Sequence, residues 1–227
     1  MVRLSIAIMA VPERKEMVYS LIKQLGRNVP IAWDDDYQGI WWNCQRAWKM
    51  VKGGATHHLI LQDDALVCDN FIESAERAIS YRPHDFVGFY ANHQICTKAS
   101  EKGDSWVNIE GGVWGQAQML PVSEIGHFLS WCESHIDSSY KHDDDRLATY
   151  LSASKMGQYQ TVPSLVNHGS PDTSTTNHSA THLKVRRVAR VFTEKDALDI
   201  DWEQGLENPL YYGYPNLIAD KWLLEAK

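Results

Sequence analysis

The sequence predicts an α/β fold: a mixed, mostly parallel, Rossmann-like sheet flanked by helices. Over residues 3–90, short apolar stretches of strand length alternate with longer segments whose apolar residues recur at helical spacing. This alternation is typical of sheets built with right-handed crossovers. The regularity falls after residue 92, so we expect an irregular C-terminal part.

The first half of the predicted sheet can be assigned element by element. Residues 3–9 alternate and form the first strand, and the helix over 14–25 ends at Gly26. The same reasoning gives further strands at 29–33, 57–62 and 86–90, and further helices at 40–51 and 70–81. No G-x-G-x-x-G follows the first strand, which removes the main support for a dinucleotide cofactor.

The second half is less regular. Residues 93–112 are polar and predict a long loop or a β-ribbon, and residues 167–182 hold almost no core-forming side chain and predict a long loop. Between them we expect a strand at 114–120, helices at 121–136 and 143–154, and a short strand at 162–166 around Pro163.

Composition indicates an ordinary globular protein of one domain or one domain with an appendage. Of 227 residues, 44% are hydrophobic and 22% charged. No apolar run approaches the ~20 residues that a membrane span needs. The four widely spaced cysteines predict reduced thiols and a cytoplasmic protein. The net charge of −7 argues against broad, non-specific duplex binding.

Acidic residues follow two predicted strands. Asp34, Asp35 and Asp36 follow the second strand, and Asp63 and Asp64 follow the strand at 57–62. Ligands of open α/β sheets bind outside the carboxyl ends of the strands, and carboxylates there commonly hold a hard cation. The structural alternative is that Asp63 caps the next helix while Asp64 is solvated.

A third acidic cluster and one histidine complete the candidate residues. Asp143, Asp144 and Asp145 open a predicted helix, where the helix dipole alone would favour them. His168 lies just past a short apolar stretch and before Gly169, at the start of the long loop. A lone histidine is more often structural, but this position suits a ligand that completes a site.

Six stretches together carry a resemblance to a known family. They are Val11-Pro12-Glu13-Arg14 after the first strand, residues 39–48, Leu61-Gln62-Asp63-Asp64, Trp114-Gly115-Gln116-Ala117, Asp143-Asp144-Asp145-Arg146 and residues 163–168. In this order they resemble nucleotide-sugar-dependent glycosyltransferases of the GT-A fold, in the style of small phage and bacterial enzymes related to the lipooligosaccharide glycosyltransferase family.

The resemblance implies a Mn²⁺ or Mg²⁺ ion that bridges the diphosphate of a nucleoside-diphosphate sugar such as a UDP-sugar. Asp64 would be its ligand at the D-x-D-like motif, His168 a late ligand, and Asp63 supporting. Gln62 falls where the family has an acid, so it can hydrogen-bond a ribose but adds no charge. The implied substrate-binding residues, besides these, are Val11, Pro12, Arg14, Asp34, Asp35, Arg46, Trp114, Gly115 and Gln116.

The resemblance also implies a division of the chain. Residues 1–182 would form the catalytic domain, with the nucleotide-sugar half at about 1–92 and the acceptor half at about 93–182. Residues 183–227 would be a basic and aromatic extension packed on it. In an inverting reaction Asp144 is the candidate base, with Asp145 and Asp143 close behind; a retaining reaction needs no such base.

Several alternatives stay open. The leading acceptor is a 5-hydroxymethylpyrimidine in phage DNA, with the basic residues of 182–190 on the phosphates, and the next is a saccharide or lipooligosaccharide. A nucleotidyltransferase would share the sheet but normally has a Gly-rich loop after strand one. A metal phosphohydrolase on His142 and Asp143 would be mostly helical, and a binding module would lack a cleft near Asp34 and Asp64.

Overall fold

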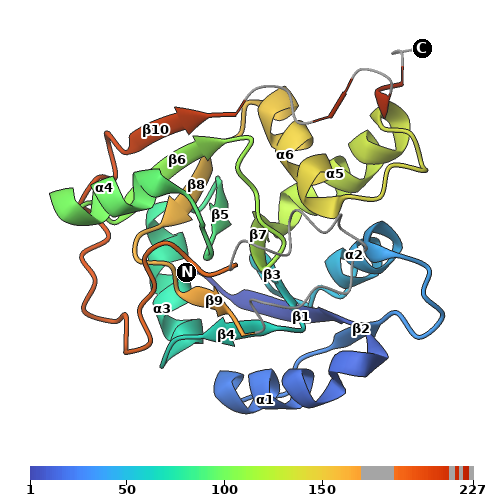
Figure 1. Cartoon of the computed structure of the whole chain (residues 1–227), viewed down its shortest axis with the longest axis horizontal. Coiled ribbons are helices and arrows are strands. Elements are labelled where there is room, and N and C mark those ends of the chain that lie inside the picture. Colours follow the sequence, from blue (N-terminus) through green and yellow to red (C-terminus); the bar gives the residue numbers. More distant parts are fainter. Residues whose placement is uncertain (170–186, 215–217, 220–221, 225–227) are drawn as a thin grey trace.

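The computed structural model describes residues 1–169, 187–214, 218–219 and 222–224, and centres on an eight-stranded sheet (Figure 1). Its strands are β1 (Leu4–Ala10), β2 (Ile31–Trp33), β3 (His57–Gln62), β5 (Phe86–Gly88), β6 (Trp106–Glu110), β7 (Ala117–Pro121), β8 (Gln158–Thr161) and β10 (Leu210–Gly213). They lie in the order β10-β6-β8-β5-β7-β3-β1-β2. A small second sheet pairs β4 (Ala65–Val67) with β9 (Val166–His168).

The sheet is mixed, and most of its strands share one direction. β1 is parallel to both β2 and β3, and β8 is parallel to β5. β7 runs antiparallel between β3 and β5, so β5 points the same way as β3. β6 opposes β8, and β10 follows β6. The predicted α/β class, with a mixed and mostly parallel sheet flanked by helices, is confirmed.

Helices cover both faces of the sheet. They are α1 (Lys15–Leu25), α2 (Ile40–Trp48), α3 (Phe71–Tyr81), α4 (Gln94–Lys102), α5 (Val122–His135) and α6 (Asp143–Ser154), with the short 3₁₀ turn η1 (Pro12–Arg14) before α1. Ile6 and Ile8 of β1 pack with α1 and α3 side chains, whereas Ala7 and Met9 pack with α2, α5 and α6. Successive strand residues face opposite sides, so β1 is buried along its whole length.

The elements β1, α1, β2, α2, β3 and α3 lie where the sequence predicts them. β3 has the predicted bounds, and α1 ends at Gly26, whose φ of 65° is the left-handed conformation that glycine adopts without strain. α2 is shorter than predicted, because its regular turns end at Trp48 rather than near residue 51. The strand–helix pattern was therefore sufficient to place the first half of the chain.

Two predictions for the second half are wrong. The expected loop or ribbon over 93–112 holds α4 and β6, because Ile95, Cys96 and Ala99 form a buried face behind mostly polar neighbours. Most of the expected strand over 162–166 is instead the gap between β8 and β9, and only Val166 belongs to β9. Pro163 has no N–H for a ladder, so one strand stops before it and the next starts after it.

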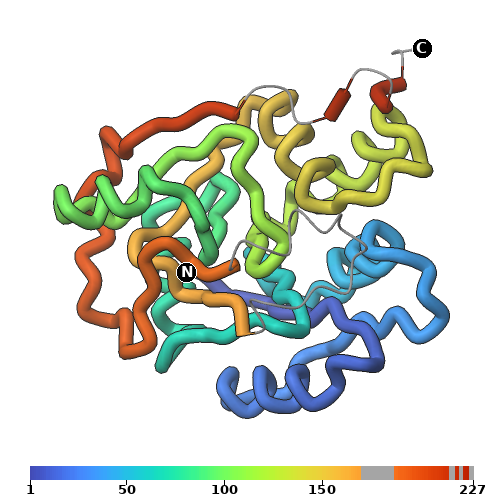
Figure 2. The backbone as a smooth tube through the Cα atoms, in the orientation of Figure 1, coloured from blue at the N-terminus to red at the C-terminus, as the bar shows by residue number. Residues whose placement is uncertain are grey.

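Segments distant in sequence lie side by side in the sheets. β9 pairs with β4, and β10 adds to the edge of the large sheet beside β6, as the backbone trace shows (Figure 2). Trp202 is buried against Trp106, with ring centroids 5.3 Å apart, and its carbonyl accepts a 2.8 Å hydrogen bond from the Trp106 indole. β10 and the segment around Trp202 thus pack on the sheet, and the domain boundary at residue 182 remains a prediction.

Two smaller expectations concern the cysteines and membrane spans. All four cysteines are buried and free, as predicted. Among the described residues, no helix has the length and apolar character needed to cross a membrane. Most of the predicted loop 167–182 and the start of the basic segment, through Arg186, lie outside the described residues.

Candidate functional site

The site lies where the parallel strands β1, β2 and β3 end. Met9 of β1 is in register with Gln62 of β3, so Val11 and Asp63 follow at the same edge of the sheet. The Asp34 amide donates a 2.9 Å hydrogen bond to the Ala10 carbonyl, which brings the end of β2 to the same place. Topology alone therefore gathers three of the predicted site segments.

Asp63 is held by the segment that follows β1. Its Oδ2 accepts a 3.0 Å hydrogen bond from the Val11 amide, and its Oδ1 accepts one of 2.8 Å from Arg14 Nη1. The side chain is buried. Pro12 opens the 3₁₀ turn that carries Arg14, so this turn aims the guanidinium back at the acidic pair. Both oxygens of Asp63 are thus committed to contacts within the chain.

Asp64 and His168 face each other across the small sheet. Ala65 of β4 is opposite His168 of β9, and the Gly169 amide donates a 2.7 Å hydrogen bond to the Asp64 carbonyl. His168 Nε2 lies 3.6 Å from Asp64 Oδ2, and Arg14 donates to the same oxygen. The two side chains are each 2% exposed. Sequence reasoning named both residues, and the β4–β9 pairing places them together.

Burial and charge set the protonation of this group. Burial lowers the pKa of His168, and Asp64 only partly opposes that effect. Burial alone would lower the pKa of Arg14, but the charges of Asp64 and Asp63 raise it. Burial raises the pKa of Asp63, against the opposing contact from Arg14. His168 is accordingly a neutral imidazole at pH 7, the form that ligates metals.

The donor set fits a divalent cation. Among the described residues, Asp64 Oδ1 and His168 Nδ1 are buried without a hydrogen-bond partner. Buried polar atoms are normally satisfied, so these two atoms are available to a partner that is not among the described residues. A carboxylate oxygen and an imidazole nitrogen form a mixed donor set that Mn²⁺ accepts, whereas Mg²⁺ favours oxygen.

The predicted nucleotide-side residues at the end of β2 have structural contacts. Asp34 is buried, and its two oxygens accept hydrogen bonds of 2.7 Å from the Gln38 amide and 2.9 Å from the Gly39 amide. It therefore shapes the loop before α2. Asp35 is exposed. Arg46 donates a 2.5 Å hydrogen bond to the Trp33 carbonyl and lies over the Trp42 ring, 4.4 Å from its centroid.

The residues predicted beside the donor sugar lie next to Gln62. Gln116 Nε2 donates a 3.1 Å hydrogen bond to Gln62 Oε1. A Cβ on Gly115 would come within 2.3 Å of Gln62 Nε2, so only glycine permits this approach. Trp114 is partly buried and packs edge-on against Tyr90, with ring centroids 6.4 Å apart. Gln62, Gly115 and Gln116 are thus in contact with one another, and Trp114 adjoins them in the chain.

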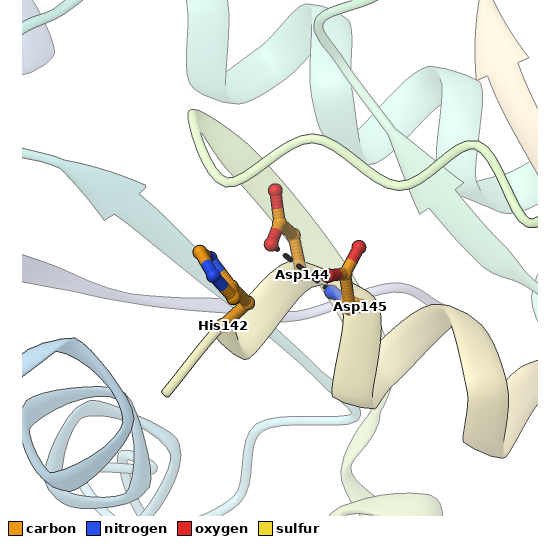
Figure 3. A group of neighbouring side chains, drawn as sticks. All are labelled: His142, Asp144 and Asp145. Atoms are coloured by element: carbon orange, nitrogen blue, oxygen red, sulfur yellow. Dashed lines mark hydrogen bonds between the residues drawn. The ribbon is translucent and has the colours of Figure 1, made fainter. Parts of the chain in front are cut away.

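A second group of acids opens α6. Ligand atoms of His142, Asp144 and Asp145 all lie within 4.8 Å of one another (Figure 3). Asp144 Oδ1 accepts a 3.0 Å hydrogen bond from the Asp145 amide, and the Tyr140 hydroxyl donates to Asp145. Buried Arg146 donates to the carbonyls of Asp137 and Tyr140, which fixes the turn leading into the helix. The group is therefore preorganised.

Asp143 and Asp144 differ in surroundings. Asp143 is fully inside, where burial raises its pKa and the Cys44 thiol of α2 is a hydrogen-bond neighbour. Asp144 is only half-buried, and burial together with the charge of Asp145 raises its pKa to about 6. Asp144 is thus the acid of the trio best suited to exchange a proton near neutral pH. α2 connects the two groups, because it starts after the Asp34 loop and contacts Asp143 through Cys44.

Two neighbours of these groups were not predicted as part of the glycosyltransferase site, and His142 entered only the phosphohydrolase alternative. His142 lies beside Asp144 and Asp145, and its position just before the acidic run was the available signal. Tyr90 is buried, and the charges of Asp64 and Arg187 both act on its hydroxyl. Nothing in the sequence indicated this, because Tyr90 reaches the site from the end of β5 through the sheet order.

Comparison with known proteins gives a weak structural likeness. No family model matches the chain, and no curated protein matches it. A crystal structure of Staphylococcus aureus TarS residues 1–349 aligns with a TM-score of 0.47 and 12% identity, over 74% of this chain and 61% of that chain. A glycosyltransferase involved in glycosylating the major capsid of PBCV-1 aligns with a TM-score of 0.30 and 11% identity, over 64% and 74%. The chain thus spans less than two thirds of the TarS fragment.

Proposed function

We propose that the protein is a metal-dependent glycosyltransferase of the GT-A fold, which moves a sugar from a nucleoside-diphosphate sugar to an acceptor hydroxyl. The observation that carries this proposal is the Asp63–Asp64–His168 group at the carboxyl ends of the parallel strands, where Asp64 and His168 each keep one buried donor atom without a partner among the described residues. The motif order in the sequence supports the same assignment.

The donor would bind at the ends of β1–β3. Asp64 and His168 would hold the ion, and a divalent ion bound there would offset the charge of the diphosphate leaving group. Val11 and Pro12 of the turn after β1 would line the base and ribose, with Asp35 nearby, while Arg46 would approach the phosphates. Gln62, with Gln116 and Gly115 behind it, would contact a hydroxyl of the donor.

The acceptor would react next to α6. As the acceptor oxygen bonds to the anomeric carbon, the bond from that carbon to the diphosphate oxygen breaks, and the hydroxyl proton passes to Asp144. A base must be ionised at the working pH, and burial raises the pKa of Asp143 further than that of Asp144, which favours Asp144. Asp145, fixed by Tyr140, would orient the acceptor. This assignment is for an inverting reaction.

For the acceptor we favour a hydroxyl on a modified pyrimidine of DNA, with a saccharide as the alternative. Arg190 is exposed and donates to Thr97 Oγ1 at 3.1 Å, so a cation of the basic segment is available on the surface. Exposed Tyr212 and Tyr214 lie near His93, and with exposed Tyr211 they offer ring faces for a base or a sugar. An assay that offers each acceptor class separately distinguishes a DNA acceptor from a saccharide.

The experiment is a donor screen with Mn²⁺ or Mg²⁺, read as nucleoside diphosphate release. UDP-, GDP- and CDP-sugars would be offered with hydroxymethylated DNA, unmodified DNA or simple saccharides. Nucleoside diphosphate release that requires both metal and one acceptor supports the proposal. Release of pyrophosphate from a nucleoside triphosphate would instead indicate a nucleotidyltransferase.

A further inference from the structure

One nitrogen of Arg14 bridges both carboxylates of the acidic pair. Nη1 lies 2.8 Å from Asp63 Oδ1 and also donates to Asp64 Oδ2. The Arg14 side chain is only 10% exposed, so salt and water screen these contacts weakly. The negative charge that would attract a metal ion is therefore already partly neutralised from within the chain.

This bridge makes the two aspartates unequal. Asp63 uses both oxygens, one for the Val11 amide and one for Arg14. Asp64 gives Oδ2 to Arg14 and keeps Oδ1, which is buried and has no partner among the described residues. Within this bridge, two carboxylates and one guanidinium leave one net negative charge. A divalent ion would thus meet a site of low charge with a single open carboxylate oxygen.

Resting on the glycosyltransferase proposal above, we propose that Arg14 is a positioning residue that makes metal binding depend on the nucleotide. The affinity of an oxygen site for a divalent cation rises with its negative charge and its number of oxygen ligands. Arg14 reduces the negative charge of the site and occupies carboxylate oxygens that could bind the ion, so the ion binds weakly without nucleotide. The diphosphate brings oxygens and negative charge, so ion and nucleotide bind tightly only together, and each raises the affinity of the other equally.

The test measures Mn²⁺ affinity by the electron paramagnetic resonance signal of the free ion, with and without UDP. In the unaltered protein, UDP should strongly tighten Mn²⁺ binding. Arg14→Gln removes the competing charge, so Mn²⁺ alone should bind roughly tenfold tighter, and the effect of UDP should shrink. Asp63→Asn should weaken Mn²⁺ binding, because it removes one negative charge and leaves the full charge of Arg14 to neutralise Asp64.

Two further variants separate the bridge from general electrostatics. Arg14→Lys should stay close to the unaltered protein, because a single nitrogen makes both contacts. Lys15→Gln removes the same charge at the next residue, which is exposed and lies over the Tyr19 ring, and should change nothing. Circular dichroism identifies any variant that does not fold. Arg14→Gln and Asp63→Asn should shift the Mn²⁺ affinity in opposite directions, so either variant tests the proposal even if the other does not fold.

The proposal is overturned if folded Arg14→Gln binds Mn²⁺ alone no tighter than the unaltered protein, or if Asp63→Asn fails to weaken it. A purely structural role for Arg14 would lower Mn²⁺ affinity in both variants. If the unaltered protein binds no nucleotide together with Mn²⁺, the glycosyltransferase proposal itself fails. That result is seen before any variant is made, so the two failures are distinguishable.

Discussion

His168 Nε2 lies 3.6 Å from Asp64 Oδ2, because the antiparallel pairing of β4 with β9 places His168 opposite Ala65, the residue after Asp64. The Gly169 amide also connects the end of β9 to the start of β4 by donating a hydrogen bond to the Asp64 carbonyl. A carboxylate and a neutral imidazole from distant parts of the sequence thus share one buried position at the end of the sheet. The predictions below follow from this relationship and from the acids of α6.

His168→Ala should weaken Mn²⁺ binding in the presence of UDP while leaving the fold intact. If His168 ligates the ion directly, the loss should exceed the roughly 10–100-fold that removing an outer partner of a metal site costs. Calorimetric titration with Mn²⁺ at saturating UDP measures this. His135→Ala, a partly exposed histidine stacked on Trp131, is the matched control and should leave the affinity unchanged. Unaltered affinity in His168→Ala would remove His168 from the site.

The turnover number should rise with pH through about 6, because Asp144 must be deprotonated to act as a base and its pKa is raised to about 6. Activity should therefore be lost as pH falls below that value. Asp144→Asn should reduce turnover by roughly 10²–10⁴-fold and abolish this limb of the profile. Glu133→Gln, an exposed acid on α5, is the control. A variant Asp144→Asn with near-normal turnover would rule out the base assignment.

Asp34→Ala should destabilise the protein, whereas Asp35→Ala should not. Asp34 is buried and accepts two backbone hydrogen bonds from the loop before α2, and losing them should lower the free energy of unfolding by roughly 1–3 kcal/mol. Asp35 is exposed, so its removal should change that free energy by less than about 0.5 kcal/mol. Urea denaturation of both variants decides. Equal stabilities would show that the Asp34 contacts do not hold the loop.

Asp143 should make the protein less stable as pH rises. Burial raises the pKa of Asp143 in the folded protein above its value in the unfolded chain. The unfolded chain thus releases this proton first, so stability is full below the unfolded pKa and falls until pH passes the folded pKa. Asp143→Asn cannot ionise and should lose less stability over that range. Urea unfolding at several pH values measures this, and parallel curves for the two proteins would contradict the effect.

The sequence was sufficient for the first half of the sheet and for naming the acids. Buried strands such as β1 and β3 are continuous apolar runs, and their ends are marked by a break into carboxylates, so Asp34, Asp63 and Asp64 could be found directly. β8 was missed because its buried residues are the polar Gln158, Gln160 and Thr161, and hydrogen bonds of the two glutamines to Gly111 and Gly112 replace an apolar pattern. A strand with buried polar side chains shows no alternation of apolar residues by which the sequence could reveal it.

Contacts between distant segments could not be predicted from the sequence. Arg14 was expected near the nucleotide, but its bridge between Asp63 and Asp64 depends on the geometry of the turn after β1. The commitment of Asp34 to the α2 loop likewise depends on two backbone amides that face inward only after the loop closes. The roles of the candidate residues remain proposals that the experiments above test.

The most direct test of the central claim is a calorimetric titration of UDP, GDP and CDP into the protein with and without Mn²⁺, repeated with Asp64→Ala. We expect one nucleoside diphosphate to bind only when Mn²⁺ is present, and Asp64→Ala to abolish that binding. Exposed Asp36→Ala, as control, should bind like the unaltered protein. Absence of metal-dependent binding for all three nucleotides, or full binding by Asp64→Ala, would contradict the account.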